Sequence, residues 1–213
     1  MTSLKSFACV AAATLGLASC AGLETLTSAA TPVELYALTP KSTFASGLPR
    51  LRQQIVVEEP TASAAVASDR ITVQPSALRV QYLPEARWVD RAPAIIQTLL
   101  IESYENTGKV DAVGRSAVGL RADYLIITDL REFQARLPAA DEPDAPLEVL
   151  VRLNMKVVDS FEDRIIASRS FQELAPAEGD DPDMVVLAFD EALGAVLKDS
   201  ISWSIREMHG HSG

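Results

Sequence analysis

Cysteine and histidine, the side chains that most often bind metal ions or act as nucleophile and base, are rare in this sequence. Its 213 residues contain Cys9, Cys20, His209 and His211, and both histidines lie at the extreme C-terminus. A zinc site needs three or four such ligands, and a Ser-His-Asp triad needs a histidine held in the body of the fold. The residue types therefore argue against a metal centre and a serine hydrolase, and we predict no enzymatic activity.

Other patterns that could carry chemistry are also weak. Gly114 and Gly119 are separated by four residues and lack the Gly-Lys-Ser ending of a phosphate-binding loop. The acidic pairs at 58–59 and 180–181 each lie beside a proline, at the boundary of a predicted element, where turn and cap residues are common. The net charge of −10 opposes phosphate binding, so we expect no nucleic-acid partner.

The first twenty residues have the layout of a secretory signal. Lys5 precedes an uncharged apolar run from Phe7 to Leu17, and small residues follow the run. The run is shorter than the roughly 20 apolar residues that span a bilayer. We predict a signal peptide over residues 1–19; an ordinary signal with a chance cysteine and a short buried helix are the alternatives.

Residues 17–20, Leu-Ala-Ser-Cys, resemble the lipobox of bacterial lipoproteins, in which cleavage precedes the cysteine and its thiol carries a diacylglycerol. The resemblance implies lipidation of Cys20 and no cofactor besides this covalent lipid. Residues 20–32 would form the anchor and a flexible tether, since they are mostly small and polar. Ala21 replaces the Asp that retains enteric lipoproteins at the inner membrane, which favours the periplasmic face of the outer membrane; inner-membrane anchoring is the alternative.

Alternating apolar and polar residues predict strands along most of the remaining chain. Segments 70–74 and 78–83 are close enough to pair as a hairpin, with Leu78, Val80 and Tyr82 on one face. Residues 61–68 are predicted as a linker, 84–89 as a turn into a short extended piece, and 138–146 as a solvated turn. The predicted strands are 33–38, 54–58, 70–74, 78–83, 109–113, 122–130, 147–158 and 164–171.

Two amphipathic helices are predicted from apolar residues at helical spacing. The first follows Asp90 as its cap, has a proline in its first turn, and ends near Gly108. The second follows Asp181, has Pro182 at its first position, and runs to about residue 206. Residues 208–213 would be a disordered tail.

The element order predicts an α+β fold in which a mostly antiparallel, mixed sheet carries both helices on one face. The domain would span residues 33–207. Arg87 and Trp88 are the candidate partner-binding residues, because they adjoin a predicted turn. A structural cation–π contact between the two side chains is the other interpretation.

Three segments carry a resemblance to a known family: Glu-Leu-Tyr-Ala-Leu at 34–38, Leu-Arg-Val-Gln-Tyr at 78–82, and Trp-Val-Asp-Arg-Ala-Pro at 88–93. Together with the lipobox and the long C-terminal helix, they resemble the auxiliary lipoproteins of ABC-type transporters. That family includes the paraquat-inducible lipoproteins encoded beside MCE-type lipid transport systems. The resemblance covers most of residues 33–206, and the acidity of this chain departs from it.

The resemblance implies a periplasmic accessory subunit that docks a phospholipid transport complex at the outer membrane. Its partners would be an MCE-domain protein and an ABC permease and ATPase, and ATP would be hydrolysed by that separate ATPase. Phospholipid itself is a further candidate ligand. Two alternatives stay open: a structural lipoprotein of envelope assembly, resembling Tol-type or lipopolysaccharide-assembly proteins, and a periplasmic lipid-binding carrier.

Overall fold

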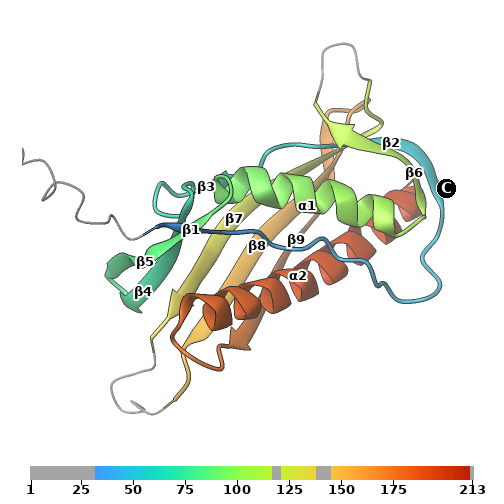
Figure 1. Cartoon of the computed structure of the whole chain (residues 1–213). Helices are drawn as coiled ribbons and strands as arrows, with labels where there is room; N and C mark the ends of the chain where they lie inside the picture. The colour runs from blue at the N-terminus through green and yellow to red at the C-terminus, as the bar shows by residue number, and fades with distance from the viewer. Residues whose placement is uncertain (1–31, 117–120, 138–144, 212–213) are drawn as a thin grey trace, which may run out of the picture. The chain divides into compact units, whose positions relative to one another are not determined.

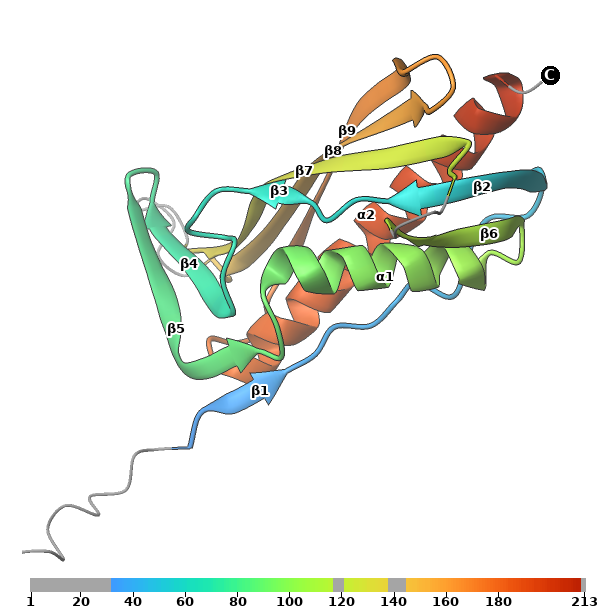
Figure 2. The same cartoon turned by 90° about the horizontal axis from the view of Figure 1, so that it is seen from above.

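The computed structural model describes residues 32–116, 121–137 and 145–211. The unit from residue 34 onward is described here, and Figures 1 and 2 show it in two perpendicular views. Its elements, in chain order, are β1 (Glu34–Tyr36), β2 (Leu51–Val57), β3 (Thr61–Ala62), β4 (Arg70–Ser76), β5 (Arg79–Trp88), α1 (Ala92–Asn106), β6 (Val110–Arg115), β7 (Tyr124–Arg136), β8 (Glu148–Asp159), β9 (Arg164–Pro176) and α2 (Pro182–His211).

Strand β7 is the centre of the sheet. Along one edge it pairs antiparallel with β8 from Tyr124↔Asp159 to Arg136↔Glu148, and β8 pairs antiparallel with β9. Along its other edge it receives three short parallel ladders, from β2, β3 and β4 in that order. Three consecutive pieces of the N-terminal chain therefore form one interrupted strand beside β7.

Two further strand pairs extend the sheet on either side of this centre. Strand β6 joins β2 in parallel, and the β4–β5 hairpin carries β1 in parallel on its outer edge. The long ladders are thus antiparallel and the short ones are mostly parallel. This mixed sheet with two helices confirms the predicted α+β fold.

Both helices cover the same face of the sheet, as Figure 1 shows. Strand β8 explains why this face is buried: Val149, Val151, Leu153, Met155 and Val157 alternate along it and are each fully buried. Period-two alternation places all five on one side of the pleat. The long strand predicted over 147–158 is confirmed together with its buried face.

Three aromatic rings join the sheet to the C-terminal helix. The ring centroids of Trp88 on β5 and Phe133 on β7 lie 5.7 Å apart, and Phe189 of α2 lies 5.2 Å from the first and 4.9 Å from the second. All three side chains are at most 2% exposed. Tilted and edge-on ring contacts at these distances add stabilisation beyond the apolar area they bury.

The helix starts differ in how well they were predicted. Asp181 Oδ1 accepts the backbone N–H of Met184 at 3.2 Å, so the predicted start of α2 is confirmed. At α1 the N-cap position is held by Arg91, without a side-chain cap, so the prediction of Asp90 as the cap is wrong. The Asp90 carboxylate turns instead to the N–H of the next residue.

Three boundaries also need correction. At 84–89 the predicted short extended piece is confirmed but the predicted turn before it is wrong, because β5 continues without a break to Trp88 through Glu85, which takes a left-handed φ of 58°. The predicted linker at 61–68 contains the two-residue strand β3. Helix α2 runs to His211, so residues 208–211 are helix rather than the predicted disordered tail. The solvated turn predicted over 138–146 lies mostly outside the described residues.

We expect Phe189→Ala to lower the free energy of unfolding by about 3–5 kcal/mol, because it removes one of three packed rings and leaves a cavity. Urea denaturation monitored by circular dichroism measures the change. Phe161→Ala is the control: Phe161 is 88% exposed, and its substitution should change stability by less than about 0.5 kcal/mol. Equal losses in the two variants would contradict the assignment of Phe189 to the core.

Candidate functional site

The predicted lipidation site, Cys20, and the tether that follows it lie outside the described residues, apart from residue 32. The described domain begins with a segment that crosses both helices, and we call residues 34–41 the N-terminal strap. The hydroxyl of Tyr36 donates to Asp183 Oδ1 of α2 at 2.8 Å, and Thr39 donates through its backbone N–H and its hydroxyl to Asp190 of α2. Leu38, between them, is buried.

The strap also contacts α1. The backbone N–H of Lys41 donates to Ser103 Oγ at 2.9 Å, and Asn106 donates its amide to the Lys41 carbonyl at 3.0 Å. The Tyr36 hydroxyl shares its one proton between carboxylate oxygens of Glu34 at 2.7 Å and Asp183 at 2.8 Å, and these acceptors raise the pKa of the phenol well above its ordinary value of 10. Together, these hydrogen bonds fix the strap to both helices.

The structure separates the two residues predicted as a partner-binding pair. Trp88 is 1% exposed and packs in the aromatic centre, so the prediction that it forms a recognition surface is wrong. Arg87 points to the other side of β5, where its guanidinium pairs with Asp69 at 3.0 Å. Because consecutive strand residues face opposite sides of the sheet, these neighbours do not stack on each other. On this hairpin the cation–π contact is made by Arg70, whose guanidinium carbon lies 3.6 Å from the centroid of the Tyr82 ring.

Large side chains occupy the space between the helices and the sheet, where a lipid carrier would need a cavity. Besides the aromatic centre, Tyr104 of α1 is fully buried, and its hydroxyl lies 2.6 Å from Ser204 Oγ of α2. Burial raises the pKa of Tyr104 above its ordinary value, so the phenol remains neutral inside the core. The two helices are thereby linked directly, which disfavours an acyl chain between them.

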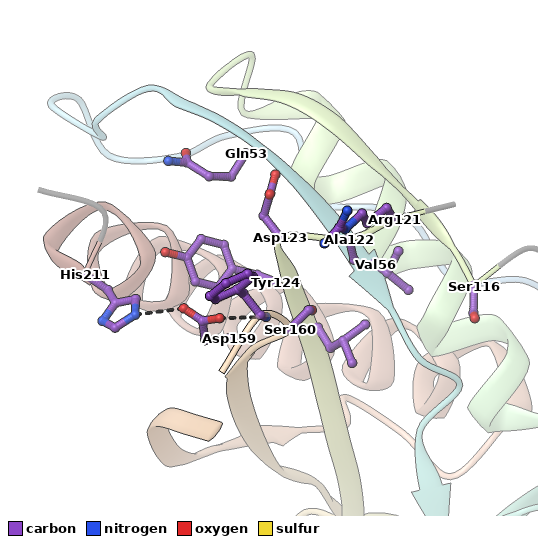
Figure 3. Close-up of a pocket in the computed structure, with 12 residues that line it drawn as sticks. Gln53, Val56, Ser116, Arg121, Ala122, Asp123, Tyr124, Asp159, Ser160 and His211 are labelled. Carbon is purple, nitrogen blue, oxygen red and sulfur yellow. Dashed lines mark hydrogen bonds and ion pairs between the residues drawn. The ribbon is translucent and has the colours of Figure 1, made fainter. Parts of the chain in front are cut away.

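A pocket of about 830 Å³ opens at the surface near the start of β7. Figure 3 shows side chains from β2, from the start of β7, from the end of β8 and from the end of α2 around it. Polar and charged groups are prominent in its lining, among them Gln53, Arg121, Asp123, Asp159 and His211. Such a lining suits a polar segment of a partner better than a lipid tail.

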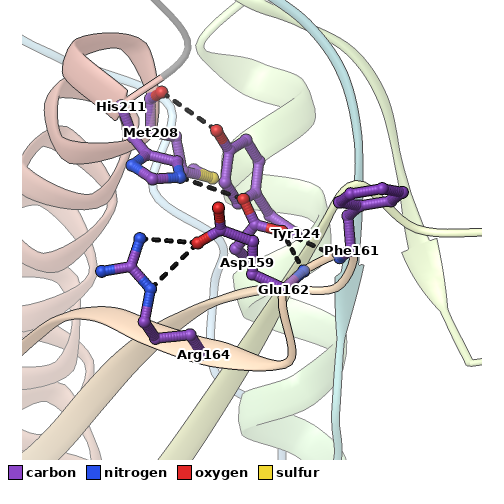
Figure 4. Close-up of polar contacts among 7 residues, drawn as sticks. All are labelled: Tyr124, Asp159, Phe161, Glu162, Arg164, Met208 and His211. Carbon is purple, nitrogen blue, oxygen red and sulfur yellow. Dashed lines mark hydrogen bonds and ion pairs between the residues drawn. The ribbon is translucent and has the colours of Figure 1, made fainter.

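Asp159 organises one side of this pocket, as Figure 4 shows. Its Oδ1 accepts the backbone N–H groups of Phe161 and Glu162 at 2.8 and 3.0 Å, and its Oδ2 lies 2.9 Å from Nε2 of His211. The N–H of Glu162 and then His211 lower the pKa of this carboxyl below its ordinary value. The contact holds the last turn of α2 against the β8–β9 turn.

The same groups are the described residues that could hold a metal ion. One donor atom each from Asp159, Glu162 and His211 lies within 4.8 Å of the others, and this donor set is one that Zn²⁺ accepts. Each already has a protein partner, because Asp159 pairs with His211 and Arg164 donates two bonds to Glu162. We therefore infer that these residues hold the last turn of α2 against the β8–β9 turn. The prediction of His211 in a loose tail is wrong.

None of the helices in the described ranges combines the length and apolar character needed to cross a bilayer. The sequence profile of the family described as ABC-type transport auxiliary lipoprotein component matches residues 36–200, from the end of β1 into α2. The matched region contains every strand pairing except part of the β1–β5 ladder, so the match covers the folded domain.

Individual proteins are similar to most of this chain. The uncharacterized protein bll6063 of Bradyrhizobium diazoefficiens is 27% identical over 187 residues, which are 87% of this chain and 49% of that protein. The chain thus spans about half the length of this curated relative. The crystal structure of protein XCC0632 from Xanthomonas campestris, of family DUF330, aligns with a TM-score of 0.78 and 27% identity over 84% of this chain and 98% of that one.

A second crystal structure, of an uncharacterized protein, aligns with a TM-score of 0.53 over 82% of this chain and 99% of that one. Its identity is 13%, so this similarity supports the fold alone.

We expect Asp159→Asn to reduce stability at neutral pH, because a neutral amide oxygen is a weaker acceptor than a carboxylate for the N–H groups of Phe161 and Glu162. The pKa of Asp159 is lower in the folded protein than the ordinary carboxyl value of 3.8. The stabilisation that the ionised Asp159 gives the fold is therefore complete above pH 3.8 and is lost as the pH falls through the lower, folded value. The gap between wild type and variant in urea midpoint should therefore be constant near neutrality and shrink in acid.

Asp163→Asn is the matched control for this experiment. Asp163 is an exposed acid on the same turn, and its left-handed φ of 51° is one that asparagine adopts readily. Its substitution should leave the urea midpoint nearly unchanged at every pH. A loss as large as that of Asp159→Asn would contradict a special role for Asp159.

Proposed function

The chain belongs to the family of ABC-type transport auxiliary lipoproteins, and we propose that it is a non-catalytic subunit that docks a lipid transport complex at the outer membrane. The family match over residues 36–200 is the observation that carries this proposal. A transporter of this type hydrolyses ATP in its own ATPase subunit, so the auxiliary subunit contributes binding and position.

The proposed anchor is a lipid on Cys20, at the end of the Leu-Ala-Ser-Cys segment. A single acyl chain gives only marginal membrane binding, whereas two or more give stable attachment. The strap supports this arrangement, because its bonds to Asp183 and Asp190 connect the start of the folded domain to α2. A tether pulled from the membrane would thus act on the whole domain.

The packed interior favours docking over lipid carriage. The rings of Trp88, Phe133 and Phe189 and the Tyr104–Ser204 contact lie where a carrier would bind an acyl chain. We propose that an MCE-domain protein is the docking partner and that phospholipid is the transported molecule. The permease and ATPase would then be reached through this partner.

We expect Cys20→Ala to release most of the protein from the membrane fraction, because the thiol that carries the anchor is gone. Cys9→Ala is the matched control, since Cys9 lies in the predicted signal peptide and should have no part in the mature protein. Ultracentrifugation of cell envelopes followed by immunoblotting measures the distribution. If the Cys20 variant sediments with membranes as wild type does, the anchor is wrong.

We further expect the wild-type protein, crosslinked in intact cells, to copurify with an MCE-domain protein and its ABC permease. Density-gradient separation of the two membranes shows which one holds the anchored subunit. The Cys20→Ala variant should show much weaker crosslinking, because the tether no longer concentrates the two partners at one membrane. Capture of outer-membrane assembly machinery instead would support the structural lipoprotein and contradict the transport role.

A further inference from the structure

The turn of the β4–β5 hairpin exposes a large apolar side chain at an unusual place. Residues Ala77 and Leu78 form the two-residue turn, and Leu78 is 99% exposed. Neither residue takes a positive φ, so this turn differs from the primed two-residue turns that favour Gly, Asn and Asp. At 99% exposure the side chain of Leu78 packs against almost nothing in the described domain, which leaves it available to a surface outside.

The end of the hairpin projects beyond the core. Six consecutive residues, 76–81, are all exposed, so neither face of the two strands is covered there. Val80, next to the turn on β5, is 46% exposed. Figures 1 and 2 both show the hairpin at the left of the domain, extending away from the β7–β8–β9 part of the sheet.

The exposed turn of the hairpin carries one cation, Arg79, in a strongly acidic protein. Its strands carry Arg70, Arg79 and Arg87 against one acid, Glu85, whereas the whole chain has a net charge of −10. Arg87 pairs with Asp69 and Arg70 lies over Tyr82, and Arg79 stands beside Leu78 at the exposed turn. Arg79 beside the exposed Leu78 complements anionic lipid head groups over an acyl layer.

The first residue of the described unit, Glu34, lies toward the hairpin turn. Strand β1 runs parallel to β5 with Glu34 opposite Ala86, so Glu34 is the end of β1 that faces the hairpin turn. From Ala86 back to Leu78 is about 26 Å at roughly 3.3 Å per strand residue. The chain from Cys20 to Glu34 can span at most about 46–50 Å when fully extended. A lipid anchor at Cys20 therefore leaves the turn within reach of the same bilayer.

We propose that the β4–β5 turn inserts into the anionic lipid surface that holds the anchor, with Leu78 among the acyl chains and Arg79 at the head groups. This proposal rests on the proposed lipid anchor. One leucine gives weak binding by itself, but the tether keeps the turn at a high local concentration near the lipid. The hairpin then fixes the orientation of the domain, which a flexible tether alone leaves free.

The test uses the full lipidated protein in vesicles of phosphatidylethanolamine and phosphatidylglycerol. A thiol-reactive NBD fluorophore is attached in the Leu78→Cys variant, whose acylated Cys20 cannot react with it. We expect the emission to shift to the blue and to be quenched by nitroxide-labelled lipids. Phe161→Cys is the matched control, because Phe161 is also an exposed apolar turn residue, on the β8–β9 turn, and its probe should stay in water.

A second pair of variants tests the charge and the leucine separately. Adding Arg79→Glu to the labelled Leu78→Cys variant should reduce the quenching of the probe at position 78. Replacing the anionic lipid with phosphatidylcholine should also reduce it. In a DEER or depth measurement made from β9, Leu78→Ala should lower the ratio of inserted to free turn by about fiftyfold, because three apolar carbons leave the acyl layer.

Three outcomes would overturn the proposal. The probe at position 78 could remain in water, it could respond no more than the probe at position 161, or it could respond only when a protein partner is added. Mass spectrometry of the N-terminus separates this failure from that of the proposed function. A bare Cys20 contradicts the anchor, whereas a lipidated Cys20 with a water-exposed turn contradicts the insertion alone.

Discussion

Hydrogen bonding along both edges of β7 is the constraint on which the rest of the domain depends. One edge pairs with β8 over nearly its whole length, and the other receives β2, β3 and β4 in turn. The N-terminal strands and the C-terminal β8–β9–α2 unit therefore meet at a single strand. Phe133, on the same strand, extends this junction into the core through its contacts with Trp88 and Phe189.

Local patterns in the sequence predict individual helices and strands, but they do not predict contacts between residues far apart in the chain. The alternation of residues 147–158 and the helical spacing along α2 reflect burial directly. The sequence therefore predicts both elements and the side of each that is buried. The parallel ladders of β2, β3 and β4 on β7 join residues about 60 or more positions apart, and no local pattern encodes such pairing. The contact between Asp159 and His211 was missed for the same reason.

The alternation of apolar and polar residues along a strand shows which side chains share a face. It does not show whether another part of the protein covers that face. Leu78, Val80 and Tyr82 were predicted on one apolar face, yet the first two are exposed, because the hairpin extends beyond the core that covers Trp88. Arg87 and Trp88 show the converse error: they were considered together as neighbours in sequence, although a strand directs them to opposite sides. Strand periodicity that continues through residue 88 places Arg87 and Trp88 on opposite faces of the sheet. The Cys20 segment is a local signature of sequence and remains a prediction, since it lies outside the described residues.

The position of the strap bears on how an anchored domain of this kind can transmit force. Tyr36 and Thr39 bond to α2, Lys41 bonds to α1, and β1 lies parallel to the hairpin strand β5. A pull along β1 toward its N-terminus acts parallel to β5 and perpendicular to the ladder bonds, so those bonds share the force instead of opening one at a time. The carboxylate acceptors of Asp183 and Asp190 add charge-assisted bonds, which are stronger than neutral ones. An entry segment that is fixed to both helices in this way moves with the core, so under the proposed anchor any pull on the chain before residue 34 would reach the whole domain.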